Sequence, residues 1–513
     1  MNTEEILGLP SALPDGVDYD QYLIATYLAN LPAAMPGPLL SMALAVEQST
    51  GTWVPVPGET PELRREHIAK VIGVYAVPDY EFELPKGLES RDWIIQVAYP
   101  EVNIGEQIPM LMTTVIGNVS MAGNVKLLDV RFPKKYVAGF KGPKFGIDGI
   151  RKLLNIPKRP ILNNMIKPCT GYPLELGAEL FRQAALGGCD IIKDDELIAD
   201  ASFNSAMGRV KRYMEIEKQV FEEKGEHTLY TVNITDRVPK VLENAKRAVE
   251  LGCNALMINY LAVGIDVMRA ITEDPAINVP VLGHMDVAGA MYMSPLHGLS
   301  SHLVLGKLPR LAGADIVVIP APYGKAPVLV DKFQNVAKNL TFPLYHLKPT
   351  FPMPSGGITQ PMVPKVMQEL GNDIVIGSGG GIHAHPQGPI AGGKAFRQAI
   401  DATMRGIPLK EYAKEHPELD VVMKQWADPF GKGGSGGCVT QDRRRGTARR
   451  APTGDTSCSE GRIQLVCGHP GRIAMRPYVT AAAGFVPLYP PYNGAFYARS
   501  VSLVLDYGAC RGA

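Results

Sequence analysis

The residues Lys193-Asp194-Asp195-Glu196 form the densest cluster of chemically active side chains in the sequence, directly after the apolar run 190–192. Carboxylates this close together repel one another unless a cation neutralises them. Oxygen ligands of this kind suit Mg²⁺. The cluster therefore predicts a magnesium site. The alternative interpretation is a solvated loop whose charges form ion pairs.

Two glycine clusters could bind a phosphate group: Ser355-Gly356-Gly357, and Gly379-Gly380-Gly381, which is followed by IHAHPQG. Consecutive backbone N–H groups can surround phosphate oxygens without any side chain. Turns also need glycine for their own geometry, so each cluster alone is weak evidence. Together they favour phosphate binding if they follow the last two strands of a barrel.

These residues need a regular scaffold to bring them together, and residues 146–430 have the pattern of one. Short apolar runs alternate with amphipathic helical stretches every 25–40 residues or so, and they include ILNNMIKP, CDIIKDDE, LYTVNIT, ALMINY, VPVLGHMD, ADIVVIPA and IVIGSGGG. Seven or eight β-then-α units predict a parallel (β/α)₈ barrel, in which the carboxyl ends of the strands converge. The alternative is an open doubly wound sheet, but no glycine fingerprint follows the first strand.

Residues 1–145 mix short strand-like and helical runs, which predicts a small α+β domain ahead of the barrel. We expect strands at 22–26 and 93–98, and helices at 36–47 and 60–70.

Residues 431–513 have a different composition. They open with the flexible linker composition GKGGSGG, and they contain ten arginines, four of the seven cysteines and a single lysine, Lys432. No helical or strand period persists there. One interpretation is a basic, partly disordered tail that binds an acidic partner. The other is coding sequence read in the wrong frame or past its stop.

The overall composition is that of an ordinary soluble protein of two or three domains, with 513 residues, 46% hydrophobic and 20% charged. A net charge of +1 provides no field that would attract nucleic acid or an anionic membrane. No run of eighteen apolar residues and no signal-peptide pattern is present. Seven cysteines, an odd number, do not suggest a disulfide framework. We therefore expect the chain to reside in a reducing cytoplasm.

The stretch GGCDIIKDDE is similar to the metal-binding motif of the RuBisCO large-chain superfamily, and the similarity extends over most of residues 20–430. The resemblance implies a Mg²⁺-dependent enzyme that acts on a phosphorylated keto-compound through an enediolate. It also implies that CO₂ carbamylates Lys193, and that the carbamate binds Mg²⁺ together with Asp195 and Glu196. Asp194 would point away from the metal.

Further segments resemble the family in the expected order. Lys167, in Ile166-Lys167-Pro168, would transfer protons if its pKa were lowered; a phosphate-binding or salt-bridging role is the alternative. His284, in VPVLGHMD, matches an active-site histidine. The segments EQSTGTW and TTVIGN imply an antiparallel homodimer in which each N-terminal domain reaches the partner's barrel. Glu47 and Asn118 would approach the substrate, and Thr52 and Trp53 the phosphate.

Three departures distinguish this chain from the carboxylases of the family. Cys169 stands where they carry a second lysine, Met285 where an arginine binds the second phosphate, and Val318 where a histidine serves the same end. Methionine offers no donor to a phosphate dianion. The chain therefore resembles the RuBisCO-like, form IV, members rather than an authentic ribulose-bisphosphate carboxylase.

Two further positions decide which reaction the resemblance favours. HPQGPIAGGKAFRQAIDA and SPLHGLSSHLVLGKL resemble the 2,3-diketo-5-methylthiopentyl-1-phosphate enolase of methionine salvage. That enolase has a lysine in place of Asn118 and tends to lack a counterpart of Lys325, which the carboxylases keep to handle a carboxylate group. We therefore expect a decarboxylase of the 3-oxo-isoapionate-4-phosphate type, with the enolase as the alternative. A non-catalytic paralogue is disfavoured by the complete set of reactive residues.

Overall fold

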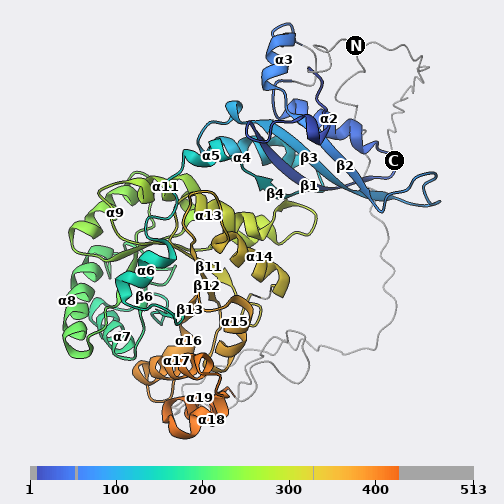
Figure 1. Ribbon diagram of the computed structural model, residues 1–513. Helices are drawn as coiled ribbons and strands as arrows, with labels where there is room; N and C mark the ends of the chain where they lie inside the picture. Colours follow the sequence, from blue (N-terminus) through green and yellow to red (C-terminus); the bar gives the residue numbers. More distant parts are fainter. Residues whose placement is uncertain (1–7, 52–55, 327, 427–513) are drawn as a thin grey trace, which may run out of the picture. The chain divides into compact units, whose positions relative to one another are not determined.

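Eight parallel strands form the barrel that the alternating pattern predicted, with helices around them (Figure 1). The computed structural model describes residues 8–51, 56–326 and 328–426, so the atypical segment 431–513 lies outside the described residues. The strand order is β12-β11-β9-β8-β7-β6-β5-β13, and β12 also contacts β13, which closes the barrel. The strands are β5 (Ile161–Met165), β6 (Ile191–Lys193), β7 (Leu229–Asn233), β8 (Ala255–Ile258), β9 (Val281–Gly283), β11 (Ile316–Pro320), β12 (Phe351–Ser355) and β13 (Val375–Ser378).

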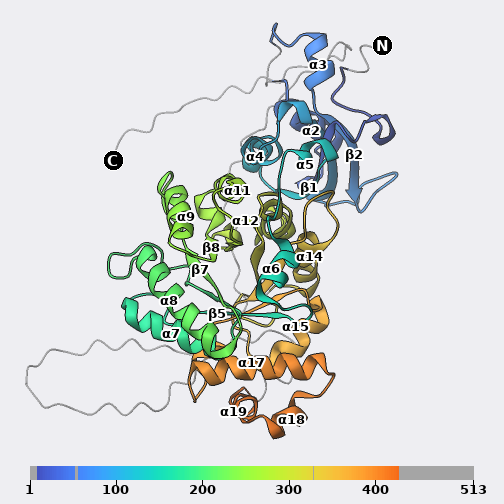
Figure 2. The ribbon, with the colours of Figure 1, turned by 60° about the vertical axis from the view of Figure 1, so that its left-hand side comes forward.

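The helices that follow the strands lie outside the barrel (Figure 2). They are amphipathic, as a helix covering a sheet must be. The longer ones are α7 (Leu174–Leu186), α8 (Ala206–Lys224), α9 (Lys240–Glu250), α11 (Ile265–Glu273), α14 (Val330–Thr341), α15 (Val363–Leu370) and α17 (Pro389–Met404). Shorter segments are α10 (Tyr260–Val263), α12 (Ala288–Tyr292), the π-helix η4 (Leu303–Lys307), α13 (Leu308–Leu311), α16 (Gly380–His383), α18 (Leu409–Tyr412) and α19 (Pro417–Gln425).

The barrel has two separate apolar layers, because successive strand residues point to opposite faces. The inner layer is a distinct buried cluster that includes Ile161, Ile191, Leu229, Met257 and Val318. Helix α6 (Gly146–Leu154) contributes Ile147, Ile150 and Leu154 to the same cluster. The barrel interior is therefore filled with side chains, and the polar residues that follow the strands lie at its carboxyl end.

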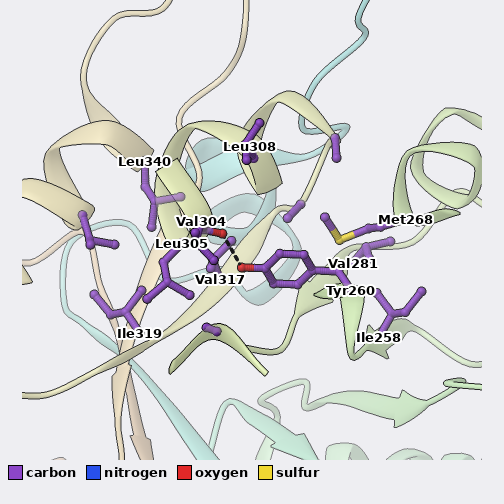
Figure 3. Close-up of a cluster of buried hydrophobic side chains, with 14 of the residues drawn as sticks. Ile258, Tyr260, Met268, Val281, Val304, Leu305, Leu308, Val317, Ile319 and Leu340 are labelled. Carbon is purple, nitrogen blue, oxygen red and sulfur yellow. Dashed lines mark hydrogen bonds between the residues drawn. The ribbon is translucent and has the colours of Figure 1, made fainter. Parts of the chain in front are cut away.

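The outer layer fills the space between the strands and the surrounding helices, and Figure 3 shows part of it. In that cluster the Tyr260 hydroxyl donates a hydrogen bond of 2.7 Å to the Val304 carbonyl, so its one polar group is satisfied within an apolar region. The other labelled side chains are Ile258, Met268, Val281, Leu305, Leu308, Val317, Ile319 and Leu340.

The N-terminal domain is the predicted α+β unit, built on a five-stranded sheet of order β10-β4-β1-β3-β2. Its elements are β1 (Tyr22–Pro32), α2 (Gly37–Glu47), α3 (Pro61–His67), β2 (Lys70–Val77), β3 (Ser90–Pro100), α4 (Ile108–Ile116), β4 (Val125–Arg131) and α5 (Lys134–Ala138). Strand β10 (Gly298–Leu299) comes from the barrel sequence and pairs in parallel with β4. The loop that follows β9 thus reaches from the barrel into the N-terminal sheet.

The helix predicted at 60–70 is shorter than expected. It ends at His67, Ile68 is already extended, and Lys70 begins β2. The β-branched residues around Lys70 favour a strand, and this part of the strand is buried. The strands predicted at 22–26 and 93–98 are both present but longer, as β1 and β3. Among the described residues, none of the helices has the length and apolar character needed to cross a membrane.

Candidate active site

The barrel brings the predicted reactive residues together at one end, because parallel strands direct their carboxyl ends to the same face. Lys167 follows β5, Asp195 and Glu196 follow β6, and His284 follows β9. Strands β5 and β6 are hydrogen-bonded neighbours, with Met165 beside Lys193. Residues 28 and 88 positions apart in the sequence, Lys167 with Asp195 and Glu196 with His284, therefore meet within hydrogen-bonding distance.

Two ion pairs and a histidine form the centre of the site. Lys167 Nζ donates to Asp195 Oδ2, and Lys193 Nζ lies 3.1 Å from Glu196 Oε2. His284 Nε2 lies 3.3 Å from the same Glu196 oxygen. Lys193 and Asp195 are buried, whereas the side chains of Lys167 and Glu196 are 28% and 29% exposed. Of these four side chains, the two partly exposed ones are the more accessible to a substrate.

The charged groups of the site shift one another's pKa values. Burial alone would raise the pKa of Glu196, but Lys193 and His284 outweigh it and lower this pKa to about 2. The pKa of Lys167 is raised, which is opposite to the lowered value expected of a base. Burial does lower it, but the hydrogen bonds to Asp195 and to the Cys169 thiol, 3.0 Å away, raise it more. As the residues stand, Lys167 is a proton donor.

Asp194 points away from the two ion pairs and into the protein. Its carboxylate accepts hydrogen bonds from Arg209 at 2.9 Å, the Tyr230 hydroxyl at 2.9 Å and the Asn233 backbone N–H at 2.9 Å. Asp194 and Arg209 are both completely buried. This network holds the chain between Lys193 and Asp195, so their side chains face the site. Sequence reasoning missed Arg209, although an arginine on the buried stripe of an amphipathic helix is a signal.

A second missed pair lies beside Lys167. His383 Nε2 is 3.1 Å from Asn164 Oδ1, and Asn164 is buried in β5. Burial, together with the Lys167 ammonium, lowers the pKa of His383 to about 4. His383 is therefore neutral near pH 7. The signals were present in the IHAH and NNM sequences, but nothing in their spacing connects residues 219 positions apart.

The glycine clusters take the expected positions after the last two strands. Ser355 ends β12, and Gly356 and Gly357 have φ angles of +95° and +108°, a region that favours glycine. Gly379 precedes the short helix α16, whose first N–H groups have no partner within the helix. A Cβ on Gly379 would lie 2.8 Å from Lys167 Cε, so glycine here also gives the lysine stem room to pass.

Lys325 lies in the loop after β11 and is exposed. Its backbone N–H donates a 2.5 Å hydrogen bond to the Gly356 carbonyl. A Cβ on the preceding Gly324 would overlap that carbonyl at 1.9 Å, so the two loops approach as closely as glycine allows. Lys325 therefore stands beside one of the two glycine clusters.

The positions that depart from the carboxylases are apolar in the structure as well. Val318 is buried in the inner barrel cluster, and Met285 packs against that cluster. Both follow from the strand register: Val318 is an inward residue of β11, and Met285 comes two residues after β9. These two positions contribute no cation to the barrel interior.

The N-terminal candidates lie apart from the barrel centre. Glu47 and Asn118 line the same open hollow of about 620 Å³, along with His67, Asn103 and Thr113. The hollow lies among α2, α4 and the segment after α3, within the N-terminal domain. Among the described residues, no hydrogen bond or ion pair joins Glu47 or Asn118 to the barrel residues of this chain. Thr52 and Trp53 lie outside the described residues.

The donor set can be tested against Mg²⁺ on its chemistry. Asp195 and Glu196 supply two carboxylates, and no set of three His, Cys, Asp or Glu residues suited to a metal occurs among the described residues. A carbamate on Lys193 would supply the third oxygen donor. Thr231 is the register neighbour of Lys193 on β7, and its buried hydroxyl has no hydrogen-bond partner. This hydroxyl could donate a hydrogen bond to a carbamate on Lys193. The residues therefore fit Mg²⁺ if Lys193 is carbamylated.

Comparison with known proteins identifies relatives along nearly all of the described chain. The catalytic-domain model of the ribulose bisphosphate carboxylase large chain matches residues 146–426, and the N-terminal-domain model matches residues 18–136. A ribulose bisphosphate carboxylase-like protein of Archaeoglobus fulgidus is 58% identical over 79% of this chain and 93% of its own length. The 2,3-diketo-5-methylthiopentyl-1-phosphate enolase of Bacillus cytotoxicus is 39% identical over 75% of this chain and 93% of its own length.

Solved structures agree with these relationships. A RuBisCO-like protein (MtnW) of Alicyclobacillus acidocaldarius superposes with a TM-score of 0.74 at 35% identity, covering 79% of this chain and 99% of that one. A dimeric archaeal Rubisco of Hyperthermus butylicus superposes with a TM-score of 0.73 at 28% identity, covering 82% and 99%. The named enolases support the alternative reaction better than the decarboxylation preferred from sequence. With both domains matched and the reactive residues gathered at the barrel's carboxyl end, the chain belongs to the ribulose bisphosphate carboxylase large-chain family as a RuBisCO-like protein.

Proposed function

We propose that this protein is a Mg²⁺-dependent enolase that converts the keto form of a small phosphorylated diketone into its enol form. The observation that carries the proposal is the arrangement of Lys167–Asp195 and Lys193–Glu196 pairs with His284 at the barrel mouth. The candidate substrate is 2,3-diketo-5-methylthiopentyl-1-phosphate, because relatives up to 39% identical carry that enolase name.

The metal requirement follows from charge balance. In the arrangement described, the two carboxylates Asp195 and Glu196 are balanced by the ammonium groups of Lys167 and Lys193. Carbamylation changes Lys193 from one positive to one negative charge, a change of two units that a divalent cation restores. Bound there, Mg²⁺ would supply Lewis-acid stabilisation to oxygen atoms that become negative during enolisation.

Lys167 is our candidate for moving the proton at the substrate carbon. Burial is the largest single effect on its pKa and lowers it, but the contacts with Asp195 and Cys169 together raise it more. If Asp195 turned to a metal, that partner would be lost, and burial would then favour the neutral amine that can act as a base. The removed carbon-bound proton would reside on Nζ, and the electron pair would move onto the carbonyl oxygen. His383, next to Lys167, is neutral near pH 7 and so adds no positive charge beside the Lys167 amine.

The remaining residues position the substrate. The backbone N–H groups of Gly356, Gly357 and the start of α16 would hold a single phosphate. The interior beside β9 and β11 contains Met285 and Val318, so a second phosphate there would leave a dianion poorly paired, at a cost of several kcal/mol. This favours a substrate with one phosphate and an apolar far end.

A homodimer with shared active sites fits the position of the N-terminal candidates. Glu47 and Asn118 line an open hollow of the N-terminal domain and not the barrel centre of their own chain. If they act on substrate, they would do so in a partner's barrel. The related Rubisco of Hyperthermus butylicus is described as dimeric.

A second candidate, decarboxylation of a phosphorylated oxo-acid, is favoured by one observation. Lys325 stands exposed beside the Gly356-Gly357 turn, where an ammonium could accompany a carboxylate as it leaves as CO₂. Cleavage of the carbon–carbon bond would produce the same enediolate, which Lys167 would then protonate.

Lys325→Met separates the two candidates. Under the enolase proposal, the variant converts the diketo-phosphate, followed by deuterium exchange at the substrate carbon, at the wild-type rate. Under decarboxylation, wild type releases CO₂ from oxo-acid phosphates and the variant loses most of that release. Absence of exchange with the diketo-phosphate, together with CO₂ release that depends on Lys325, would overturn the enolase proposal.

A further inference from the structure

The imidazole of His284 lies between two carboxylates. Its Nδ1 is 3.0 Å from Asp286 Oδ2, and its Nε2 is 3.3 Å from Glu196 Oε2. A neutral imidazole has only one N–H to donate, so the two carboxylates compete for it. The nitrogen that holds the proton decides which nitrogen can exchange a proton with the substrate.

The surroundings favour Asp286 in this competition. Its contact with His284 is the shorter one, and among the described residues the Asp286 carboxylate forms no hydrogen bond or ion pair with any other side chain. The Glu196 carboxylate, by contrast, already has Lys193 at 3.1 Å. Asp286 therefore makes the shorter contact with the imidazole and has fewer competing partners than Glu196.

The backbone holds Asp286 in place through an unusual turn. The Ala288 N–H donates a 3.1 Å hydrogen bond to the Met285 carbonyl, and Val287 has φ +72° and ψ −17°. These angles are those of the third position of a type II β-turn, which normally requires glycine. Val287 is 52% exposed, so core packing does not impose its conformation. A β-branched residue held in this region is strained.

The far end of the same loop is fixed as well. Lys126 of β4 donates a 2.9 Å hydrogen bond to the Tyr292 carbonyl, and residues 298–299 pair with β4. The segment from His284 to β10 is therefore anchored both at the barrel and at the N-terminal sheet.

We infer that Asp286 is a positioning residue, which keeps the proton of His284 on Nδ1 and so presents Nε2 toward the reacting part of the substrate. This inference deepens the proposed function and rests on it for the catalytic consequence. The hydrogen-bond arrangement itself can be measured without any activity.

The first test is therefore nuclear magnetic resonance of protein labelled with ¹⁵N-histidine, without substrate, at pH 8. His284→Asn identifies the His284 signals by their loss. We expect wild-type His284 to carry a proton on Nδ1, and Asp286→Ala to lose it. Val287→Gly, a matched control in the same turn, suits the type II geometry and keeps the carboxylate, so it should retain the Nδ1 proton. An Nδ1 without a proton in wild type would overturn the inference, whatever the enzyme's activity.

The second test is the steady-state rate with 2,3-diketo-5-methylthiopentyl-1-phosphate. We expect Asp286→Ala to lower kcat about 10–100-fold with little change in KM, because the loss of an orienting partner typically has this size. Asp286→Asn keeps an oxygen acceptor and should recover part of the loss. Asp331→Asn, a change at an acidic residue of α14, is the control and should have no effect. A wild-type rate in the folded Asp286→Ala protein would refute the positioning role. A wild type without enolase activity would instead refute the proposed function, and the Nδ1 measurement would still decide the inference.

Discussion

Replacing Arg209 with methionine tests how the site is held in shape. Arg209 donates to Asp194 at 2.9 Å, to the Asn204 carbonyl at 2.6 Å and to the Ala199 carbonyl at 2.8 Å, all without solvent exposure of its side chain. Methionine has similar length but no donor. The change would leave the Asp194 carboxylate buried with only neutral donors. Breaking one partner of a buried ion pair costs about 3–5 kcal/mol, and we expect a loss of stability of that size.

The stability loss caused by Arg209→Met is measured best with a double-mutant cycle. Arg209→Met, Asp194→Asn and the double variant are compared by thermal unfolding against wild type. The Asp194→Asn change removes the uncompensated charge, so the double variant should be more stable than Arg209→Met alone, by about 1 kcal/mol or more. Because Asp194 lies between Lys193 and Asp195, Arg209→Met should also lower enolase activity in protein that remains folded. A stability loss below about 1 kcal/mol for Arg209→Met would refute the reasoning.

Two further outcomes follow from the structure. The pKa of His383 is lowered from 6.5 to about 4 in the folded protein, so the unfolded chain takes up this proton first as the pH falls. The free energy of unfolding is therefore unaffected by His383 above pH 6.5 and decreases as the pH falls toward 4. At pH 5 the decrease is about 2 kcal/mol. His383→Gln should remove that part of the pH dependence, seen as a smaller fall in melting temperature between pH 7.5 and 5, and an unchanged fall would contradict it. Truncation after Phe430 should leave the barrel's thermal transition and the oligomer intact, because α19 already completes the core with buried Leu419 and Val422; loss of that transition on calorimetry would show that residues 431–513 belong to the fold.

The barrel and the centre of its site could be predicted from sequence because both depend on local patterns. Alternating apolar runs mark strands, and Lys193, Asp195 and Glu196 are adjacent in the chain, so one strand end brings them together. The end of α3 at His67 was misjudged, because no proline or glycine separates this polar helix from the buried strand that follows it.

The supporting residues could not be predicted in this way, since their contacts join distant parts of the chain. His383 meets Asn164 across 219 residues, and no spacing rule relates them. The raised pKa of Lys167 likewise depends on the distance to Asp195, which only the closed barrel determines. Asp286 was visible two residues after His284, but whether it faces the imidazole depends on the turn at Val287.

The central claim is that a carbamate on Lys193 completes a magnesium site with Asp195 and Glu196. It is tested most directly by the rate of deuterium exchange into 2,3-diketo-5-methylthiopentyl-1-phosphate after preincubation with bicarbonate and Mg²⁺, with either one alone, and with excess chelator. We predict full activity only when both are present, and none in Lys193→Ala under any condition. Full activity in excess chelator, or in Lys193→Ala, would contradict the account.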